Sequence, residues 1–159
     1  MSVCIAMNMG INDESLQDLA ACALMHDNAL TQYIKEELHN NYIDIHGKQK
    51  QLPQVGQHCI LGEQNIKELP FNTDVTNVIL YHHENADGSG YPNNLKGEEI
   101  PLGARILRVC DAFGALIANR PYRSAFDIET AISIMIEEVK NFDMQVFLAF
   151  QRVVHKEKA

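Results

Sequence analysis

Apolar residues recur at helical spacing along most of this chain. The first clear stripe follows Asn12 and consists of Leu16, Leu19, Ala20, Ala23 and Leu24. Asn12 or Asp13 can cap this helix, because a side-chain oxygen there accepts a hydrogen bond from the free amides of the first turn. His26 comes seven residues after Leu19 and Asp27 follows it, so the predicted inward face ends in an imidazole and a carboxylate.

The next two predicted helices also place histidines on apolar faces. The second begins near Pro53, and its stripe is His58, Leu61, Gly62, Asn65, Ile66 and Leu69. The third carries Val75, Val78 and Ile79 and leads into His82 and His83 at the same spacing. A looser stretch from Thr31 to Pro53 separates the first two helices, so three helices bring four histidines and Asp27 to inward positions.

Three further helices are predicted after a second loose stretch, from Glu84 to Gly103, which is rich in Gly, Pro and Asn. The fourth starts near Leu102, and its stripe is Leu107, Cys110, Asp111, Gly114 and Ala118. The fifth carries Ile128, Ala131, Ile132, Met135, Ile136 and Val139 after a capping Asp127, and the last spans Met144 to His155. The last two show no inward ionisable group and are predicted to be scaffold.

Composition favours one soluble domain. The chain has 159 residues, of which 46% are hydrophobic and 21% charged. Its net charge of −8 argues against DNA binding, which needs a basic face. No apolar run approaches the roughly 18 residues of a membrane span, and no basic flank of a secretory signal precedes Gly10, so we expect a cytoplasmic location. The spacing of Cys4, Cys22, Cys59 and Cys110 fits neither a zinc ribbon nor a disulfide framework and predicts four reduced core residues.

The inward imidazoles and carboxylates need a common partner. A single histidine on an apolar stripe is more often a hydrogen-bonded core residue than a ligand, but six such groups on four helices favour a metal site, because burying charges without partners is costly. The donors include no thiolate, a mixture that suits Fe, Mn, Zn or Ni in a hydrolytic centre. Asp27, next to His26, can bridge two ions, and a pair of ions roughly 3.5–4 Å apart stabilises both the attacking and the leaving oxygen of a phosphodiester.

Several segments together resemble the HD-GYP domains. They are HD at His26–Asp27, His58 followed by Gly62, HHENADGSGYP from His82 to Pro92, GEEIPLGARILRVCDAF from Gly97 to Phe113, and RPYR from Arg120 to Arg123. HD alone is a weak signal, whereas the combination is highly specific. The resemblance is close from His82 to Arg123, looser elsewhere, and spans nearly the whole chain.

The resemblance implies an all-α HD-domain-like bundle of about six to seven helices with a Gly/Pro-rich GYP loop, in a single domain over residues 1–159 that lacks the start of its first helix. It implies two or three divalent metal ions (Fe, Mn, or Zn or Ni) and hydrolysis of the bacterial second messenger cyclic di-GMP to linear pGpG or GMP. The implied metal ligands are His26, Asp27, His58, His82, His83 and Asp111, with Asp27 and His58 also catalytic. The implied substrate-side residues are Tyr91, Arg120 and Arg123.

The residues themselves leave alternatives open on the substrate side. Gly88, Ser89 and Gly90 make a loop whose backbone can approach a ligand closely, but Tyr91–Pro92 can equally brace that loop. Arg120 and Arg123 can reach phosphate oxygens or be surface charges. Glu84 can orient a neighbouring imidazole or face water.

Three features depart from the family pattern. The family usually reads HD-x-G-K, whereas this chain reads HDNAL from His26 to Leu30, so Leu30 stands where a lysine would meet a phosphate or the developing charge. No histidine precedes His26, where the family has a further ligand, and Gly114 replaces a second aspartate. Two alternatives to the phosphodiesterase therefore remain. One is a degenerate domain that binds metal, cyclic dinucleotide or a diguanylate cyclase domain through the GYP loop, and the other is a phosphohydrolase acting on another nucleotide.

Overall fold

The computed structural model describes residues 1–32, 55–71, 73–120 and 123–156. These residues form seven α-helices and no strand, which confirms the prediction of an all-α bundle. The helices are α1 (Ser2–Asn8), α2 (Asp13–Met25), α4 (His58–Ile66), α5 (Thr73–Tyr81), α6 (Leu102–Ile117), α7 (Ile128–Glu137) and α8 (Met144–Lys156). Single 3-10 turns occupy Asn28–Gln32, Val55–Gln57, Gly97–Glu99 and Val139–Asn141. Most of the loose stretch predicted from Thr31 to Pro53 lies outside the described residues.

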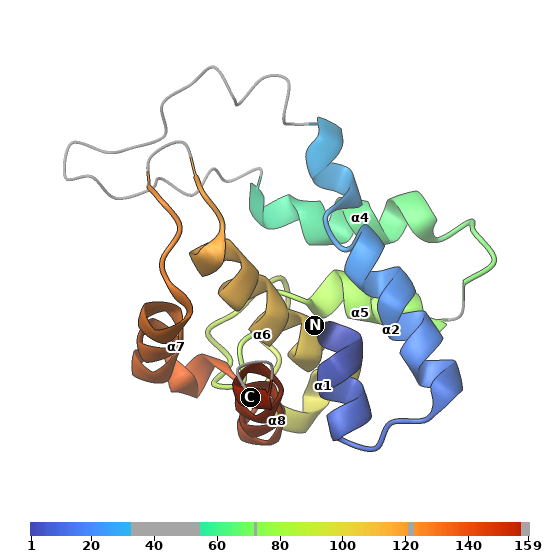
Figure 1. The fold of residues 1–159 in the computed structure, drawn as a ribbon. Helices are drawn as coiled ribbons and strands as arrows, with labels where there is room; N and C mark the ends of the chain where they lie inside the picture. The colour runs from blue at the N-terminus through green and yellow to red at the C-terminus, as the bar shows by residue number, and fades with distance from the viewer. Residues whose placement is uncertain (33–54, 72, 121–122, 157–159) are drawn as a thin grey trace.

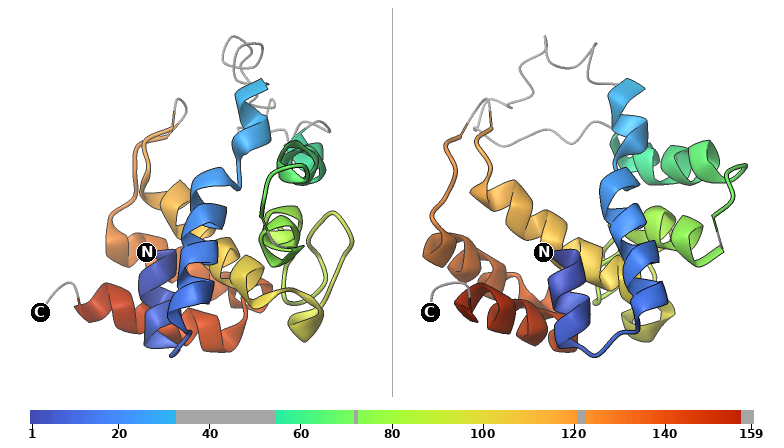
Figure 2. Two further views of the ribbon diagram at one scale, coloured as in Figure 1. Left: turned by 90° about the vertical axis from the view of Figure 1, so that its right-hand side faces the viewer. Right: turned by 45° about the vertical axis from the view of Figure 1, so that its right-hand side comes forward.

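Helix α6 runs through the middle of the molecule (Figure 1). It contacts α7 and α8 on one side and α5 on the other, and α1 lies against α6, α2 and α8. Figure 2 shows the same division, with α2, α4 and α5 on one side of α6 and α7 and α8 on the other. The core follows this arrangement, since Ile5 of α1, Ile106 of α6 and Phe150 of α8 are fully buried.

The predicted caps determine where two helices begin. The side chain of Asn12 accepts a hydrogen bond of 3.0 Å from the amide of Ser15 at the start of α2. Asp127 does the same for Thr130 at the start of α7, also at 3.0 Å. The expected positions of both helices are thereby confirmed, and the cap at Asn12 sets the register that carries α2 to His26.

Some predicted core positions are exposed. Leu24 is 87% exposed because α2 packs on α1 and α5 and this residue faces neither. Leu69 lies beyond the end of α4, and Asn65 is exposed on it. Ile128 and Ile136 are exposed on α7 and Gly114 on α6, because the packed face of each helix is narrower than the predicted stripe. All four cysteines are free, as expected, but Cys4 lies at the surface rather than in the core.

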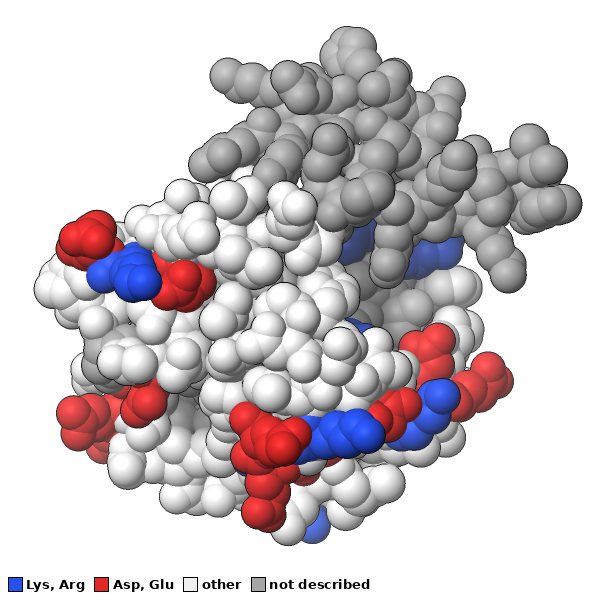
Figure 3. Space-filling model, turned by 180° about the vertical axis from the view of Figure 1, so that it is seen from behind, with Lys and Arg blue, Asp and Glu red and all other residues white. Residues whose placement is uncertain are grey.

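Acidic and basic side chains alternate on the surface. On the face drawn in Figure 3 they gather in a band along one edge and in a smaller cluster, with a broad area between them that shows neither. On that face, the described residues form no continuous basic stripe of the kind that DNA binding uses. No helix among the described residues has the length and apolar character that a membrane span requires.

Candidate metal centre

The HD pair lies where α2 ends. His26 is the C-terminal cap of α2, and its Nδ1 is 3.0 Å from the carbonyl oxygen of Ala23. Because a carbonyl only accepts, Nδ1 must carry the proton, which leaves the lone pair on Nε2 for a cation. Asp27 follows in the turn and projects its carboxylate toward α4 and α5. The end of α2 thus supplies one oriented imidazole and one carboxylate.

Helix α4 begins at His58, which is 1% exposed. The α4 helix approaches the HD turn closely because Gly62 has no side chain; a Cβ there would lie 3.3 Å from the Asn28 amide nitrogen and 3.2 Å from Ile79. Asn28 joins the two segments, since its amide donates to the carbonyls of Met25 and Gly62. The spacing from His58 to Gly62 therefore reflects the packing that brings His58 to Asp27.

Two more histidines follow α5, which ends at Tyr81. His82 is fully buried, and its Nδ1 donates to the carbonyl oxygen of Ile79 at 2.6 Å. As at His26, this hydrogen bond leaves the Nε2 lone pair facing inward. The two Nε2 atoms of His58 and His82 are only 3.2 Å apart.

The carboxylate of Asp27 is surrounded by imidazole nitrogens. Its Oδ1 lies 3.4 Å from His58 Nε2 and 3.7 Å from His82 Nε2, and its Oδ2 lies 3.4 Å from His26 Nε2. Although Oδ1 is buried, it has no hydrogen-bond partner among the described residues. Burial alone would raise the pKa of Asp27, but the neighbouring imidazoles of His82, His26 and His58 outweigh burial and lower it to about 2. Asp27 is therefore an anion whose oxygens face lone pairs, an arrangement that a cation satisfies.

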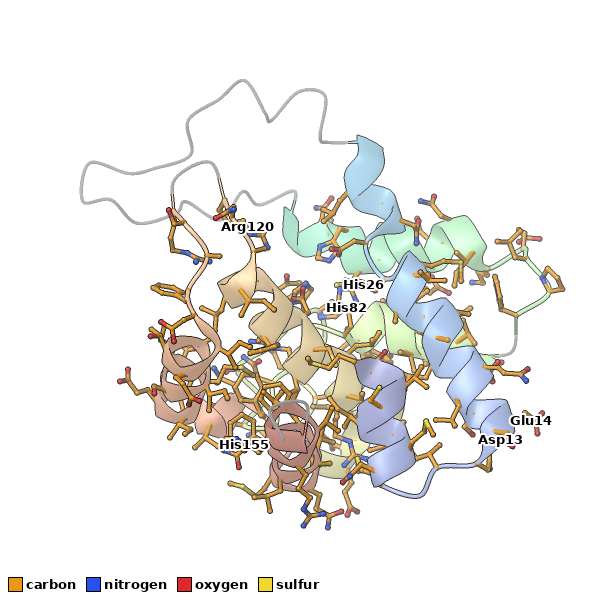
Figure 4. All side chains as sticks on the ribbon, in the orientation of Figure 1. Asp13, Glu14, His26, His82, Arg120 and His155 are labelled. Atoms are coloured by element: carbon orange, nitrogen blue, oxygen red, sulfur yellow. The ribbon has the colours of Figure 1, made fainter. Side chains whose placement is uncertain are left out.

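Donor atoms gather in two groups around Asp27, each with its atoms within 4.8 Å of one another. His26, Asp27 and Asp111 form the first group, to which Asp111 comes from the middle of α6. The second group contains His58, Cys59, His82 and His83. Figure 4 shows His26 and His82 side by side in the middle of the molecule. All six predicted ligands thus lie in these two groups, and the donor set fits two divalent ions of the Fe, Mn, Zn or Ni type.

Tyr91 borders the second group. Its ring stacks on that of His83 with centroids 5.0 Å apart and an interplanar angle of 19°. Burial lowers the pKa of His83 to about 2, with further lowering by the charges of His82, His58 and Arg108, so this imidazole is neutral and can donate a lone pair. Burial also raises the pKa of Tyr91, which leaves its hydroxyl protonated. Tyr91 can therefore both brace His83 and offer a hydrogen bond to a ligand.

The segment that follows the histidines turns back on itself at Gly90. A Cβ at this position would overlap the Asn85 amide, Glu84 Cα and the carbonyl of His83. Glycine is thus required for the close approach of the two backbones. This contact places Tyr91 against His83.

Glu84 adopts neither of its two predicted roles. It is 1% exposed, and its two carboxylate oxygens accept hydrogen bonds from the amides of Asn93 at 2.6 Å and Leu95 at 3.1 Å. The carboxylate thus binds the loop backbone and does not face water. It anchors the end of the GYP loop, defined here as residues 84–95.

The two arginines of the RPYR segment differ in their contacts. Their backbones form an isolated antiparallel bridge with each other. The side chain of Arg120 is exposed (Figure 4). The guanidinium of Arg123 donates to the carbonyls of Ala115, Leu116 and Ser124 and lies 4.4 Å above the ring of Phe126. Because Arg123 is engaged at the end of α6, Arg120 has the side chain better placed for a phosphate.

Because of this difference, alanine at Arg123 is expected to affect stability, whereas alanine at Arg120 is expected to affect substrate binding. Arg123→Ala is expected to lower the free energy of unfolding by about 1–3 kcal/mol, since it leaves helix-end carbonyls without a donor. Arg120→Ala is expected to leave stability within about 0.5 kcal/mol and to raise the KM for a phosphate ester instead. Chemical denaturation and steady-state kinetics check both, and equal destabilisation by the two variants would contradict the assignment.

Sequence reasoning missed two side chains at the centre. Cys59 was expected to be an ordinary core residue, yet its Sγ lies 3.6 Å from His58 Nε2. Arg108, one turn before Asp111 on α6, donates from Nε to Asn85 in the GYP loop at 2.8 Å. Burial lowers the pKa of Arg108, while the charges of Asp111, Tyr91 and Glu138 offset part of that effect. The position of Arg108 three residues before a predicted ligand was the available signal, because i and i+3 share a helix face.

The chain matches the model of the HD domain family over residues 1–146. It is 35% identical over 155 residues to a 3′3′-cGAMP-specific phosphodiesterase from Vibrio cholerae, covering 95% of this chain and 32% of that protein. It is 33% identical over 134 residues to a cyclic di-GMP phosphodiesterase response regulator from Xanthomonas campestris pv. campestris, covering 82% of this chain and 34% of that protein. The chain therefore spans about a third of the length of these curated relatives.

The fold also has a counterpart among solved structures. An HDG"Y"P protein from Bdellovibrio bacteriovorus superposes with a TM-score of 0.72 over 97% of this chain and 49% of that chain, at 22% sequence identity. At this level of identity the likeness concerns the fold. The family match and the relatives show that the chain belongs to the HD domain family, and its motifs from His26 to Arg123 resemble those of HD-GYP proteins.

Proposed function

We propose that this chain is a metal-dependent phosphodiesterase that hydrolyses cyclic di-GMP to linear pGpG or GMP. The observation that carries the proposal is the carboxylate of Asp27, whose buried Oδ1 has no hydrogen-bond partner among the described residues while imidazole nitrogens approach both of its oxygens. Shared cations resolve this arrangement, and a pair of cations is the usual catalytic device for phosphodiester hydrolysis. The names of the relatives support the same reaction class.

Each group of the centre has a proposed role. Bound divalent ions would stabilise charge on the phosphoryl oxygens and make a water nucleophilic at neutral pH. Asp27 would connect the two donor groups, with His58, His82 and His83 holding one side and His26 and Asp111 holding the other. The protonated hydroxyl of Tyr91 and the exposed guanidinium of Arg120 would orient the dinucleotide by hydrogen bonding and charge. This scheme keeps the six predicted ligands in their expected roles.

Two alternatives remain, each favoured by one observation. Leu30 leaves the HD turn without the lysine of the family pattern, which favours a domain that binds metal and cyclic dinucleotide, or a diguanylate cyclase domain, without turnover. The similarity to a cGAMP-specific phosphodiesterase favours hydrolysis of a different cyclic dinucleotide. A positive side chain nevertheless lies near the centre, because Arg108 is one turn before Asp111 on α6 and donates to Asn85 in the GYP loop.

One assay separates these possibilities. The purified chain is analysed for metal content, supplied with Mn(II) or Fe(II), and incubated separately with cyclic di-GMP and 3′3′-cGAMP. We expect metal-dependent release of linear product from cyclic di-GMP. Binding of both metal and nucleotide without product would select the degenerate domain, hydrolysis of cGAMP alone would select the second alternative, and absence of metal binding would reject the proposal.

A further inference from the structure

We infer that Sγ of Cys59 is a ligand of the metal ion held by His58 and His82, so that one half of the centre is a nitrogen–sulfur site. The inference rests on the metal centre of the proposed function, but it concerns a residue that the family motifs do not include. It also changes the expected chemistry of the donors, which the sequence pattern had limited to imidazole and carboxylate. Cys59 follows His58 in the first turn of α4.

Three distances measured from Nε2 of His58 match the edges of a tetrahedral metal site. With metal–nitrogen bonds of about 2.05 Å and a metal–sulfur bond of about 2.3 Å, a tetrahedral site has N–N edges of about 3.3 Å and N–S edges of about 3.6 Å. The two Nε2 atoms of His58 and His82 are 3.2 Å apart, and Cys59 Sγ is 3.6 Å from His58 Nε2. Asp27 Oδ1 lies 3.4 Å from the same His58 nitrogen. The atoms around His58 Nε2 are thus already spaced as ligands of a common cation.

Burial separates Cys59 from a surface thiol. Cys59 is fully buried, as is His82, and His58 is 1% exposed. Nδ1 of His82 already donates to the carbonyl of Ile79, so it has no second proton for the thiol. The alternative to metal coordination is a weak S–H···N hydrogen bond from the thiol of Cys59 to Nε2 of His58. Cys22 offers a matched contrast, because it is equally buried but its Sγ contacts only the carbonyl oxygen of Val75 among the described residues, at 3.8 Å.

A thiolate donor changes which metals the centre prefers. Soft sulfur ligands favour Zn(II), Fe(II) and Co(II), whereas carboxylate and water suit Mn(II) and Mg(II). Coordination by Cys59 would release the thiol proton to solvent. The resulting metal–thiolate bond is weaker for Mn(II) than for Zn(II). We therefore expect Zn(II) to be retained over Mn(II), and expect this preference to fall about ten-fold or more in Cys59→Ser.

Cobalt(II) spectroscopy tests the inference without measuring activity. The whole chain is stripped with a chelator and titrated with Co(II) as wild type, Cys59→Ser and the matched control Cys22→Ser. Wild type and Cys22→Ser are expected to show visible ligand-field bands together with a near-ultraviolet sulfur-to-cobalt charge-transfer band. Cys59→Ser is expected to keep the visible bands and lose the charge-transfer band, with circular dichroism confirming that it is folded.

The outcomes distinguish the inference from the function on which it rests. Visible bands without charge transfer in wild type would leave the metal centre standing and overturn the role of Cys59. A charge-transfer band that survives in Cys59→Ser would likewise overturn it, and its loss on Cys4→Ser would identify an adventitious surface site. If wild type binds no Co(II) at all, the metal centre itself fails. If Cys59→Ser does not fold, a wild-type spectrum without charge transfer still overturns the role of Cys59, and a band that persists in both Cys4→Ser and Cys22→Ser supports it.

Discussion

Asp27→Asn is expected to reduce hydrolysis by about 100-fold or more and to lower the number of ions bound per chain. Asparagine keeps the shape of the side chain but removes the negative charge and presents an amide N–H₂ on one side. Since Oδ1 of Asp27 faces His58 and His82 while Oδ2 faces His26, the substitution affects both donor groups at once. Asp27 is thus the carboxylate that approaches imidazole nitrogens of both groups.

Metal content by elemental analysis and the rate of cyclic di-GMP hydrolysis check this expectation. Asp13→Asn is the matched control, because Asp13 lies exposed at the other end of α2, where it makes no contact with the centre. The control should keep both metal and activity. Full occupancy of both sites in Asp27→Asn, with a normal rate, would show that the carboxylate does not bridge and would remove the main support for a shared centre.

The sequence was sufficient to predict the convergence of the ligands. His26, His58 and Asp111 each stand on a periodic apolar stripe, and burial of such groups without a partner is too costly to be repeated on several helices. The caps at Asn12 and Asp127 were predictable for a similar reason, since they depend on interactions within one turn. Local patterns of this kind determine the face on which a residue lies.

Contacts between segments far apart in the chain were not predictable in the same way. Cys59 is adjacent in sequence to a predicted ligand, but the sequence pattern predicts only a small core residue at this position. The packing of α4 against α5 brings its sulfur to the histidines. Leu24 was predicted to be buried but is exposed, because the period of apolar residues does not show where a neighbouring helix ends. The exposure of Leu24 and the position of the Cys59 sulfur both depend on how the helices pack, and local sequence patterns do not determine that packing.

The same limit applies to charge at the centre. Leu30 could be identified as a lost lysine from the motif, but the position of Arg108 relative to Tyr91 and Asp111 depends on how the GYP loop folds over α6. The hydrogen bond from Arg108 to Asn85 joins these two elements. The centre therefore has a positive side chain nearby, Arg108, even though Leu30 replaces the lysine of the motif.

Glu84→Ala is expected to lower the free energy of unfolding by about 1–3 kcal/mol, because it leaves two backbone amides of the GYP loop without the carboxylate acceptor. Both carboxylate oxygens are used, one by the amide of Asn93 and the other by the amide of Leu95. Loss of this anchor should also loosen Tyr91 at its place against His83, which would raise KM more than it lowers metal content.

Denaturation curves, metal analysis and kinetics on Glu84→Ala, Glu84→Gln and the exposed control Glu98→Ala test this role. Glutamine retains a single acceptor oxygen and turns its N–H₂ toward the second amide, so Glu84→Gln should fall between the control and alanine in stability. A role in orienting an imidazole predicts a different order, in which metal is lost from Glu84→Gln while stability is nearly unchanged. Because the carboxylate bonds to the loop backbone, we expect stability to fall first and the metal to remain.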